Sequence, residues 1–287
     1  MFIKFTNKIV SQSKIYYLDI GARGGIAWPW SAIQSDKLEV FLVEPDPEEA
    51  ALLQKQGYGK VLPYALWSKE TELTLNINNL PSTSSLFEPN IKFLNQFPDS
   101  QRFESNETVN LKTKTIDGLA SEGELKSIDF VKIDVQGGEY AILKGGEDFF
   151  KNNIVGLEVE VEFAEMYQNQ PLFSDVDIFV REKLGLELWD IRKVYWKYKQ
   201  NKYQAPLKGR LIFGDALYLR PALTLDSWLS EMDKDTASSK MKALITSAIA
   251  YGYLDYASTL LSKDYSDKYI SKETKEQYIQ QVKKISK

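Results

Sequence analysis

Tyr16-Tyr17-Leu18-Asp19-Ile20-Gly21-Ala22-Arg23-Gly24-Gly25 is the stretch of sequence that decides the fold. Its first half belongs to the apolar run Ile15 to Ile20, whose β-branched and aromatic residues predict a buried strand. In α/β proteins, a buried strand followed by a glycine turn and a helix forms a nucleotide-sized pocket at the carboxyl edge of the sheet. The stretch therefore predicts an α/β fold with a nucleotide site.

The spacing of this turn indicates which nucleotide would bind. A dinucleotide-binding turn has glycines at its first, third and sixth places, but here the order is Asp19-x-Gly21-x-x-Gly24. A carboxylate in the first place would repel a pyrophosphate and would suit a ligand with positive charge and no phosphate. S-adenosylmethionine, with its ammonium group and sulfonium centre, is such a ligand. A helix-capping role is the structural alternative for Asp19.

A second acid follows the next predicted strand. The apolar run Leu38 to Val43 ends in Glu44-Pro45-Asp46-Pro47. An acid at the tip of the second strand can accept hydrogen bonds from both ribose hydroxyls, whereas a solvated turn acid is the alternative. A third strand, from Lys60 to Tyr64, would place Ala65 and Leu66 where adenine would lie.

Composition excludes several kinds of site. The 287 residues include 36 Lys and Arg against 40 Asp and Glu, so the net charge of −4 gives no bulk attraction to nucleic acid. Without cysteine there is no thiolate metal site, and without histidine the commonest general base is missing. Residues 1–8 lack the apolar core of a signal peptide, and no apolar run approaches the ~18 residues of a membrane span. We therefore expect a cytoplasmic protein.

A second junction of strand, acid, glycine and helix lies in the middle of the chain. The strand predicted from Ser127 to Val135 contains Asp134 near its end, continues into Gln136-Gly137-Gly138-Glu139, and leads to a helix from Tyr140 to Lys144. In a parallel sheet this junction comes up beside the first. Asp134 would then face the reacting centre.

The next predicted strand, Ile154 to Phe163, alternates acids with apolar residues. Glu158, Glu160 and Glu162 therefore share one face. On an edge strand they would be solvated. If the strand is central, as we expect, at least one of these acids has a function at its carboxyl end.

Candidate substrate contacts lie in two loops. Leu186 to Val194 and Arg210 to Arg220 predict an antiparallel hairpin at the sheet edge, and Trp196 and Tyr198 in its loop could stack on sugar rings or bases. An exposed hairpin without substrate contact is the alternative. Ser84, in a loop rich in hydroxyl groups, could contact a polar substrate or only cap a helix.

The composition changes at Ala222. Met241 to Ser262 and Ser266 to Lys287 have the spacing of two helices, which suggests packing or homo-oligomerisation rather than chemistry. We therefore divide the chain into a domain of residues 1–221 and a helical extension of residues 222–287.

The sequence resembles the FkbM-type methyltransferases between about Ile15 and Arg220. The most specific block, Lys132-Ile133-Asp134-Val135-Gln136-Gly137, is similar to the family's Lys-Ile-Asp-Val-Glu-Gly pattern, with Gln136 in place of its Glu. The other blocks are Leu18 to Gly25, Val43 to Pro47, and Glu160 to Phe163 with Tyr167 and Pro171 to Phe173. The resemblance implies a Rossmann-like seven-stranded methyltransferase sheet, mostly parallel with an antiparallel C-terminal hairpin. It also implies S-adenosylmethionine as cofactor and an oxygen of a sugar, glycan or other hydroxylated small molecule as acceptor.

Methyl transfer to an oxygen needs alignment of the acceptor and removal of its proton. In the absence of histidine we expect Asp134 first, and then Glu160 or Glu162, to be the base. The carboxylates could also hold Mg²⁺ or Ca²⁺ through oxygen ligands, although we do not expect a metal. The predicted cofactor site comprises Asp19, Gly21, Arg23, Gly24, Glu44, Pro45, Ala65, Leu66 and Asp134.

Two other classes of function stay open. One is a nucleotide-dependent oxidoreductase or transferase on the same kind of sheet, against which the missing first glycine argues. The other is a non-catalytic module that binds nucleosides or glycans on a methyltransferase scaffold, which Gln136 makes conceivable.

Overall fold

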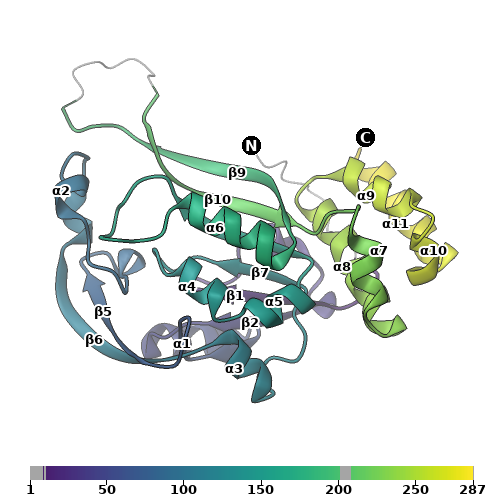
Figure 1. Cartoon of the computed structure of the whole chain (residues 1–287), viewed down its shortest axis with the longest axis horizontal. Coiled ribbons are helices and arrows are strands. Elements are labelled where there is room, and N and C mark those ends of the chain that lie inside the picture. Colours follow the sequence, from purple (N-terminus) through teal and green to yellow (C-terminus); the bar gives the residue numbers. More distant parts are fainter. Residues whose placement is uncertain (1–8, 10, 201–207, 287) are drawn as a thin grey trace.

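A seven-stranded sheet organises the computed structural model, which describes residue 9, residues 11–200 and residues 208–286 (Figure 1). Its strand order is β3-β2-β1-β7-β8-β10-β9. The pairs from β3 to β8 are parallel, and β10 is antiparallel to both of its neighbours. The predicted Rossmann-like sheet with an antiparallel C-terminal hairpin is confirmed. The N-terminal segment without a signal-peptide core, residues 1–8, lies outside the described residues.

The elements have the following bounds. The strands of the large sheet are β1 (Ile15–Ile20), β2 (Leu38–Val43), β3 (Lys60–Leu62), β7 (Phe130–Ile133), β8 (Gly156–Glu162), β9 (Glu187–Trp196) and β10 (Arg210–Leu219). A three-stranded sheet of order β4-β6-β5 consists of β4 (Ala65–Leu66), β5 (Glu72–Asn78) and β6 (Ser105–Lys114). The helices are α1 (Pro47–Gln56), α2 (Ile91–Leu94), α3 (Ile116–Ser121), α4 (Glu139–Lys144), α5 (Glu147–Asn153), α6 (Phe173–Phe179), α7 (Leu225–Ser230), α8 (Lys234–Ala250), α9 (Leu254–Ser262), α10 (Ser266–Tyr269) and α11 (Lys272–Ile285).

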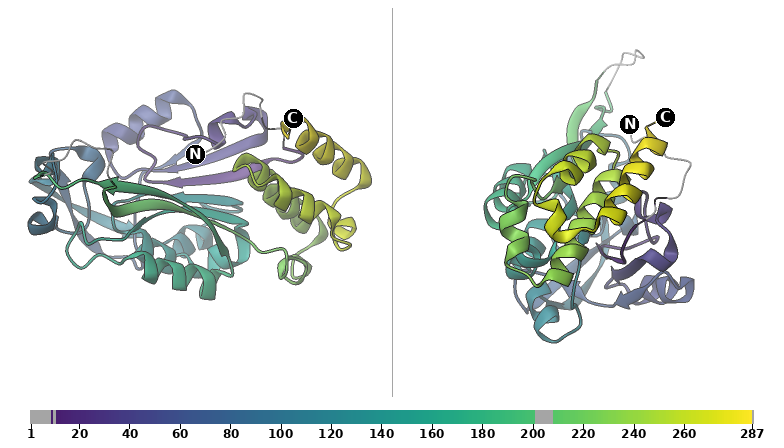
Figure 2. Two further views of the ribbon diagram at one scale, coloured as in Figure 1. Left: turned by 90° about the horizontal axis from the view of Figure 1, so that it is seen from above. Right: turned by 90° about the vertical axis from the view of Figure 1, so that its right-hand side faces the viewer.

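Two clusters of buried side chains cover the two faces of the large sheet, as the alternation of a strand requires. Leu18 and Ile20 of β1 pack with apolar residues of α3, α4, α5 and α6. Ile15 and Tyr17 point to the other face and pack with residues of α8, α9 and α11. The helices at the C-terminus therefore pack against this face at the N-terminal ends of β1 and β7, and they lie at the opposite end of the molecule from α2 and β5 (Figures 1 and 2).

A buried lysine joins α8 to the sheet. Lys240, which is 1% exposed, donates to the carboxylate of Asp129 and to the carbonyl oxygen of Ile128, each over 2.8 Å. The other carboxylate oxygen of Asp129 accepts from the backbone N–H of Tyr16 in β1. Residues on both sides of the predicted boundary at residue 221 thus share one core cluster. The division into two units and the homo-oligomerisation through the C-terminal helices stay predictions.

The described helices include none with the length and hydropathy needed to cross a membrane.

Candidate active site

The glycine turn after β1 is held by both neighbouring strands. The backbone N–H groups of Gly21 and Ala22 both donate to the carbonyl oxygen of Val43 at the end of β2. Gly21 has a φ of +84°, and a Cβ atom added to it would lie 1.9 Å from the carbonyl oxygen of Asp134. Asp134 in turn donates its N–H to the carbonyl oxygen of Ile20. Only glycine fits a turn that approaches the end of β7 so closely.

Gly21→Ala is expected to destabilise the protein by more than the ~1–3 kcal/mol typical of a strained backbone conformation, because the new methyl group also meets a backbone carbonyl. Gly123→Ala is the matched control, because Gly123 has a φ of +78° but nothing within 4 Å of an added Cβ. Urea unfolding of both variants separates the two effects. Equal losses of stability would show that the close approach to Asp134 is unimportant.

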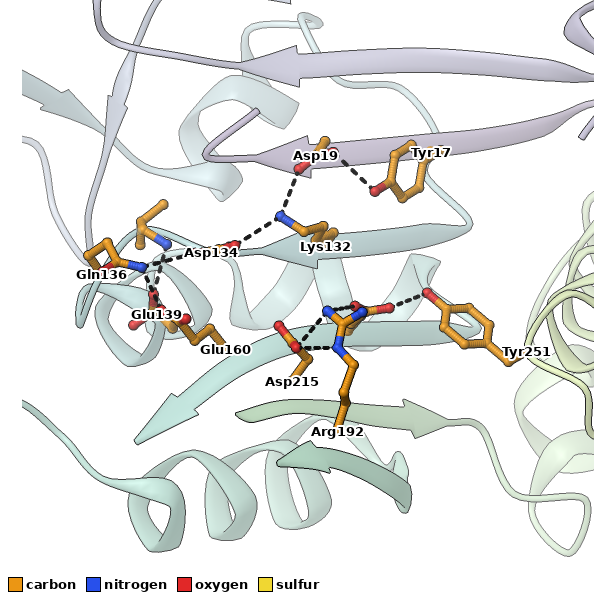
Figure 3. A network of polar contacts seen from close by, with 12 residues as sticks. Tyr17, Asp19, Lys132, Asp134, Gln136, Glu139, Glu160, Arg192, Asp215 and Tyr251 are labelled. Atoms are coloured by element: carbon orange, nitrogen blue, oxygen red, sulfur yellow. Dashed lines mark hydrogen bonds and ion pairs between the residues drawn. The ribbon is translucent and has the colours of Figure 1, made fainter. Parts of the chain in front are cut away.

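Asp19 lies buried under the turn, where it forms part of a row of polar side chains across the sheet. Lys132 lies in register between Asp19 on β1 and Glu158 on β8, so the three side chains share one face. The ammonium group of Lys132 lies 3.6 Å from Asp19 and 3.3 Å from Asp134 (Figure 3). The hydroxyl group of Tyr17 donates to Asp19 over 3.1 Å. One carboxylate oxygen of Asp19, Oδ1, is buried without a hydrogen-bond partner among the described residues.

Burial dominates the electrostatics of this row. It raises the pKa of Asp19 to about 6, and the positive charge of Lys132 offsets part of the rise. Although burial opposes the charge of Lys132, the carboxylates of Asp19 and Asp134 raise its pKa. The row thus holds one ammonium group between two acids, one of which is buried.

The residues after β2 connect the turn to α1. Asp46 caps α1 by accepting from the N–H groups of Glu48 and Glu49, which explains why the helix begins at Pro47. Arg23 forms ion pairs with Asp46 at 2.8 Å and with Glu49 at 3.5 Å. The N–H of Gly24 also donates to Glu49. Arg23 and Gly24 therefore fix the turn against α1.

Glu44 and Pro45 lie between these elements. Glu44 is 5% exposed, and its Oε1 accepts from the N–H of Asp46 over 3.0 Å. Burial raises the pKa of Glu44. Pro45 is half-buried, whereas Ala65 and Leu66 of β4 are buried next to the end of β3. These positions border the carboxyl ends of β1, β2 and β3, as the sequence predicted.

Beyond Asp134, an amide side chain connects several acids. Gln136 has a φ of 60°, and its Nε2 donates to Glu160 over 2.8 Å and to Asp134 over 3.3 Å. Its Oε1 accepts from the hydroxyl group of Tyr167. The carboxylate of Glu139 accepts from two backbone N–H groups of this loop. The Asp134 side chain is 33% exposed, so among these acids it is the one that a substrate can reach.

The acids of β8 are buried because the strand lies between β7 and β10, which confirms its predicted central place. Glu160 and Glu162 are 5% and 1% exposed. Glu158 accepts from the hydroxyl group of Tyr251 in the C-terminal segment and forms an ion pair with Arg192. Arg192 also forms an ion pair with Asp215 (Figure 3). This second group of contacts continues the polar row toward the sheet edge.

The three predicted substrate contacts have structural partners. The Oγ atom of Ser84 accepts from the N–H of Asn78 over 3.1 Å. The ring of Trp196 packs against the ring of Phe97, and Tyr198 also stacks on the Phe97 ring, with their centroids 4.9 Å apart. Tyr198 is still 46% exposed. Packing therefore accounts for much of the Trp196 surface, and a substrate role for the three residues stays a prediction.

A family model described as the methyltransferase FkbM domain matches residues 19–186. The chain belongs to the FkbM methyltransferase family. The resemblance carried by the four sequence blocks is therefore confirmed. The match includes the glycine turn, the loop after β7 and β8, and it ends before β9 and β10.

Three solved structures to which this FkbM family member is similar are described as methyltransferases. The match to a methyltransferase FkbM from Methylobacillus flagellatus has 13% identity and a TM-score of 0.39, and covers 72% of this chain but only 43% of that one. The match to a precorrin-6y C5,15-methyltransferase from Geobacter metallireducens has 12% identity and a TM-score of 0.35, and covers 75% of this chain and 84% of that one. A SAM-dependent methyltransferase from Aquifex aeolicus matches with 12% identity, a TM-score of 0.31 and coverage of 72% and 84%. No curated protein sequence matches the chain.

Sequence reasoning overlooked two residues of this FkbM site. Lys132 is a lysine in an otherwise apolar strand, and its spacing of two from Asp134 was a usable signal that both share a face. Glu139 follows the predicted strand that contains Asp134, but no pattern in the sequence predicts a role for it in the site. Its burial follows from its contacts with the N–H groups of Val135 and Gly137, which no spacing rule predicts.

Proposed function

We propose that this FkbM methyltransferase binds S-adenosylmethionine and methylates an oxygen of a sugar, a glycan or another hydroxylated small molecule. The observation that carries the proposal is the direct contact between the glycine turn and Asp134. It brings the predicted cofactor turn and the most exposed acid of the site together at one edge of the sheet.

The chain's own residues fit the cofactor. Oδ1 of Asp19 is a buried acceptor next to the turn that lies 3.6 Å from the ammonium group of Lys132 and accepts no hydrogen bond from a described residue, which supports a role in binding the ammonium group of the cofactor. Only Oε1 of Glu44 accepts a backbone hydrogen bond from the described residues, so Oε2 is left for the ribose hydroxyls. We assign Gly21, Arg23 and Gly24 to the turn around the methionine part, and Pro45, Ala65 and Leu66 to the nucleoside.

S-adenosylmethionine supplies an electrophilic methyl group. Asp134 accepts the proton of the acceptor hydroxyl. Gln136 and Lys132 each donate a hydrogen bond to one carboxylate oxygen of Asp134 and so hold that carboxylate in place. Glu160 and Glu162 are more deeply buried than Asp134. We assign them to the acceptor side of the site as the second candidates for the base. Ser84, Trp196 and Tyr198 are assigned to the acceptor side.

Isothermal titration of the full chain with S-adenosylmethionine tests the cofactor. We expect saturable binding, and the absence of heat at millimolar ligand would end the proposal. Transfer of a labelled methyl group to members of a panel of oligosaccharides and hydroxylated small molecules then tests the acceptor class. Transfer only to nitrogen acceptors would contradict O-methylation.

The affinity for S-adenosylmethionine is expected to weaken about tenfold when the pH falls from 7 to 5. The carboxylic acid of Asp19, whose pKa burial raises to about 6, must be charged to bind an ammonium group, so protons compete with the ligand below that pH. Titration at both pH values measures the change. Asp19→Asn should bind weakly and show a flatter pH dependence; an unchanged slope in this variant would assign the effect to another group.

A non-catalytic binding module is the second candidate, and Gln136 is the observation that favours it. Its neutral amide occupies the place of the family's Glu and bridges two acids of the site. Binding of S-adenosylmethionine without methylation of any offered acceptor would support this candidate. Recovery of turnover in Gln136→Glu would then show that the amide is the cause.

A further inference from the structure

Three buried carboxylates meet behind Asp134. Glu139 begins α4, and Glu160 and Glu162 lie two residues apart on β8, so both β8 side chains point to the same face. Each of the three offers an oxygen that lies within 4.8 Å of the other two. All three residues are 5% exposed or less. Buried acids at such distances repel one another unless protons or a cation lie between them.

The two basic side chains of the polar row, Lys132 and Arg192, form ion pairs with acids outside this cluster of three. Lys132 pairs with Asp19 and Asp134, and Arg192 pairs with Asp215 and Glu158. Burial, and to a smaller extent the negative charge of Asp134, raises the pKa of Glu139 to about 7, although backbone N–H groups offset part of the rise. The same two causes raise the pKa values of Glu160 and Glu162 well above their ordinary value.

The cluster also contains a buried acceptor that receives no hydrogen bond from the described residues. Glu139 is oriented by two backbone N–H groups, and Glu160 by the amide of Gln136. In contrast, Oε1 of Glu162 is buried without a hydrogen-bond partner within the part of the chain that the structure describes. The side chain of Gln170 lies close to the Glu162 carboxylate and offsets part of the rise in the pKa of Glu162, yet Nε2 of Gln170 makes no hydrogen bond of good geometry to a described residue. Two oriented carboxylates and one free oxygen are suited to a cation.

We propose that Glu139, Glu160 and Glu162 bind one hard divalent cation, such as Mg²⁺, Mn²⁺ or Ca²⁺. These ions prefer carboxylate oxygens, and three oxygens that lie within 4.8 Å of one another are close enough together to surround one ion. The role of the ion rests on the proposed function. Its charge lies behind Asp134 and Gln136, where it would lower the pKa of an acceptor hydroxyl in a chain that has no histidine.

Mn²⁺ titration of the chelator-treated full chain, followed by electron paramagnetic resonance of the free ion, tests the site. We expect the wild type to bind one Mn²⁺ per chain and Glu162→Gln to bind it at least ~10-fold more weakly. Glu107→Gln makes the same chemical change on an exposed residue of β6 and should bind Mn²⁺ as the wild type does. Equal binding in all three proteins would overturn the proposal. So would wild-type protein that binds no Mn²⁺ up to ~1 mM, the weak limit of carboxylate sites, because the acids then share protons instead.

Two further measurements keep the outcome decisive. If Glu162→Gln fails to fold, Glu160→Gln takes its place in the titration. In addition, the melting temperature of the wild type must be higher with Mn²⁺ than with chelator. Titration with S-adenosylmethionine in metal-free and Mn²⁺-loaded protein separates the two proposals. Cofactor binding without Mn²⁺ binding refutes the cation site alone, whereas Mn²⁺ binding without cofactor binding supports the site and refutes the proposed function.

Discussion

Lys240→Ala is expected to lower the free energy of unfolding by ~3–5 kcal/mol, the cost of leaving a buried charge without its partner. In the wild type the ammonium group of Lys240 donates to Asp129, Ile128 and Ser127, at 2.8, 2.8 and 3.2 Å. Asp129 is 1% exposed and also holds the N–H of Tyr16 at the centre of the sheet. Truncation of the lysine therefore leaves a carboxylate that water cannot reach. Urea unfolding followed by circular dichroism measures the loss.

Lys234→Ala is the matched control, because Lys234 begins the same helix and is exposed. Its effect should stay within ~0.5 kcal/mol, the usual range of surface substitutions. Replacement of both partners, in Lys240→Met with Asp129→Asn, should cost less than the sum of the single changes, because neither variant leaves a lone buried charge. Losses in Lys240→Ala no larger than in the control would show that α8 is anchored by its apolar residues alone.

Local signals in the sequence were sufficient for much of the fold. The bounds of α1 (Pro47–Gln56) follow from neighbouring residues in the sequence, because Pro47, Glu48 and Glu49 suit a first helical turn and Gly57 ends the helix. The strand with Glu160 and Glu162 was predicted to present its acids on one face. Such signals depend only on neighbours along the chain.

Burial of charged groups could not be predicted, because it depends on partners far away in the sequence. Lysine is almost always solvated, and the pattern of α8 gives no sign that Lys240 meets Asp129, 111 residues earlier. Tyr251, which donates to Glu158 of β8, was likewise one more aromatic residue of a helical pattern. For Trp196 the sequence left stacking on a substrate and an exposed hairpin open. The structure places Trp196 at the end of β9 rather than in the hairpin loop, where it packs on Phe97 from the segment after α2, a contact between residues far apart in the sequence.

Asp134→Asn is expected to lower turnover about 100- to 10,000-fold, the usual contribution of a general base. Asparagine has the same shape and can still accept a hydrogen bond from Gln136, so the end of β7 should keep its geometry. It cannot take up the proton of an acceptor hydroxyl. Because the Asp134 side chain is 33% exposed and the cofactor turn contacts only its backbone, S-adenosylmethionine should still bind with nearly unchanged affinity.

Single-turnover experiments measure the rate of the methyl-transfer step, which product release does not limit. They use saturating S-adenosylmethionine and the acceptor found in the panel. Asp264→Asn, the same substitution at an exposed site in the C-terminal segment, controls for the handling of the protein. Full turnover in Asp134→Asn would place the base elsewhere, and Glu160 would be next, because Gln136 connects its carboxylate directly to Asp134. Loss of both turnover and cofactor binding would instead show that Asp134 holds S-adenosylmethionine, so that the residue serves the donor rather than the acceptor.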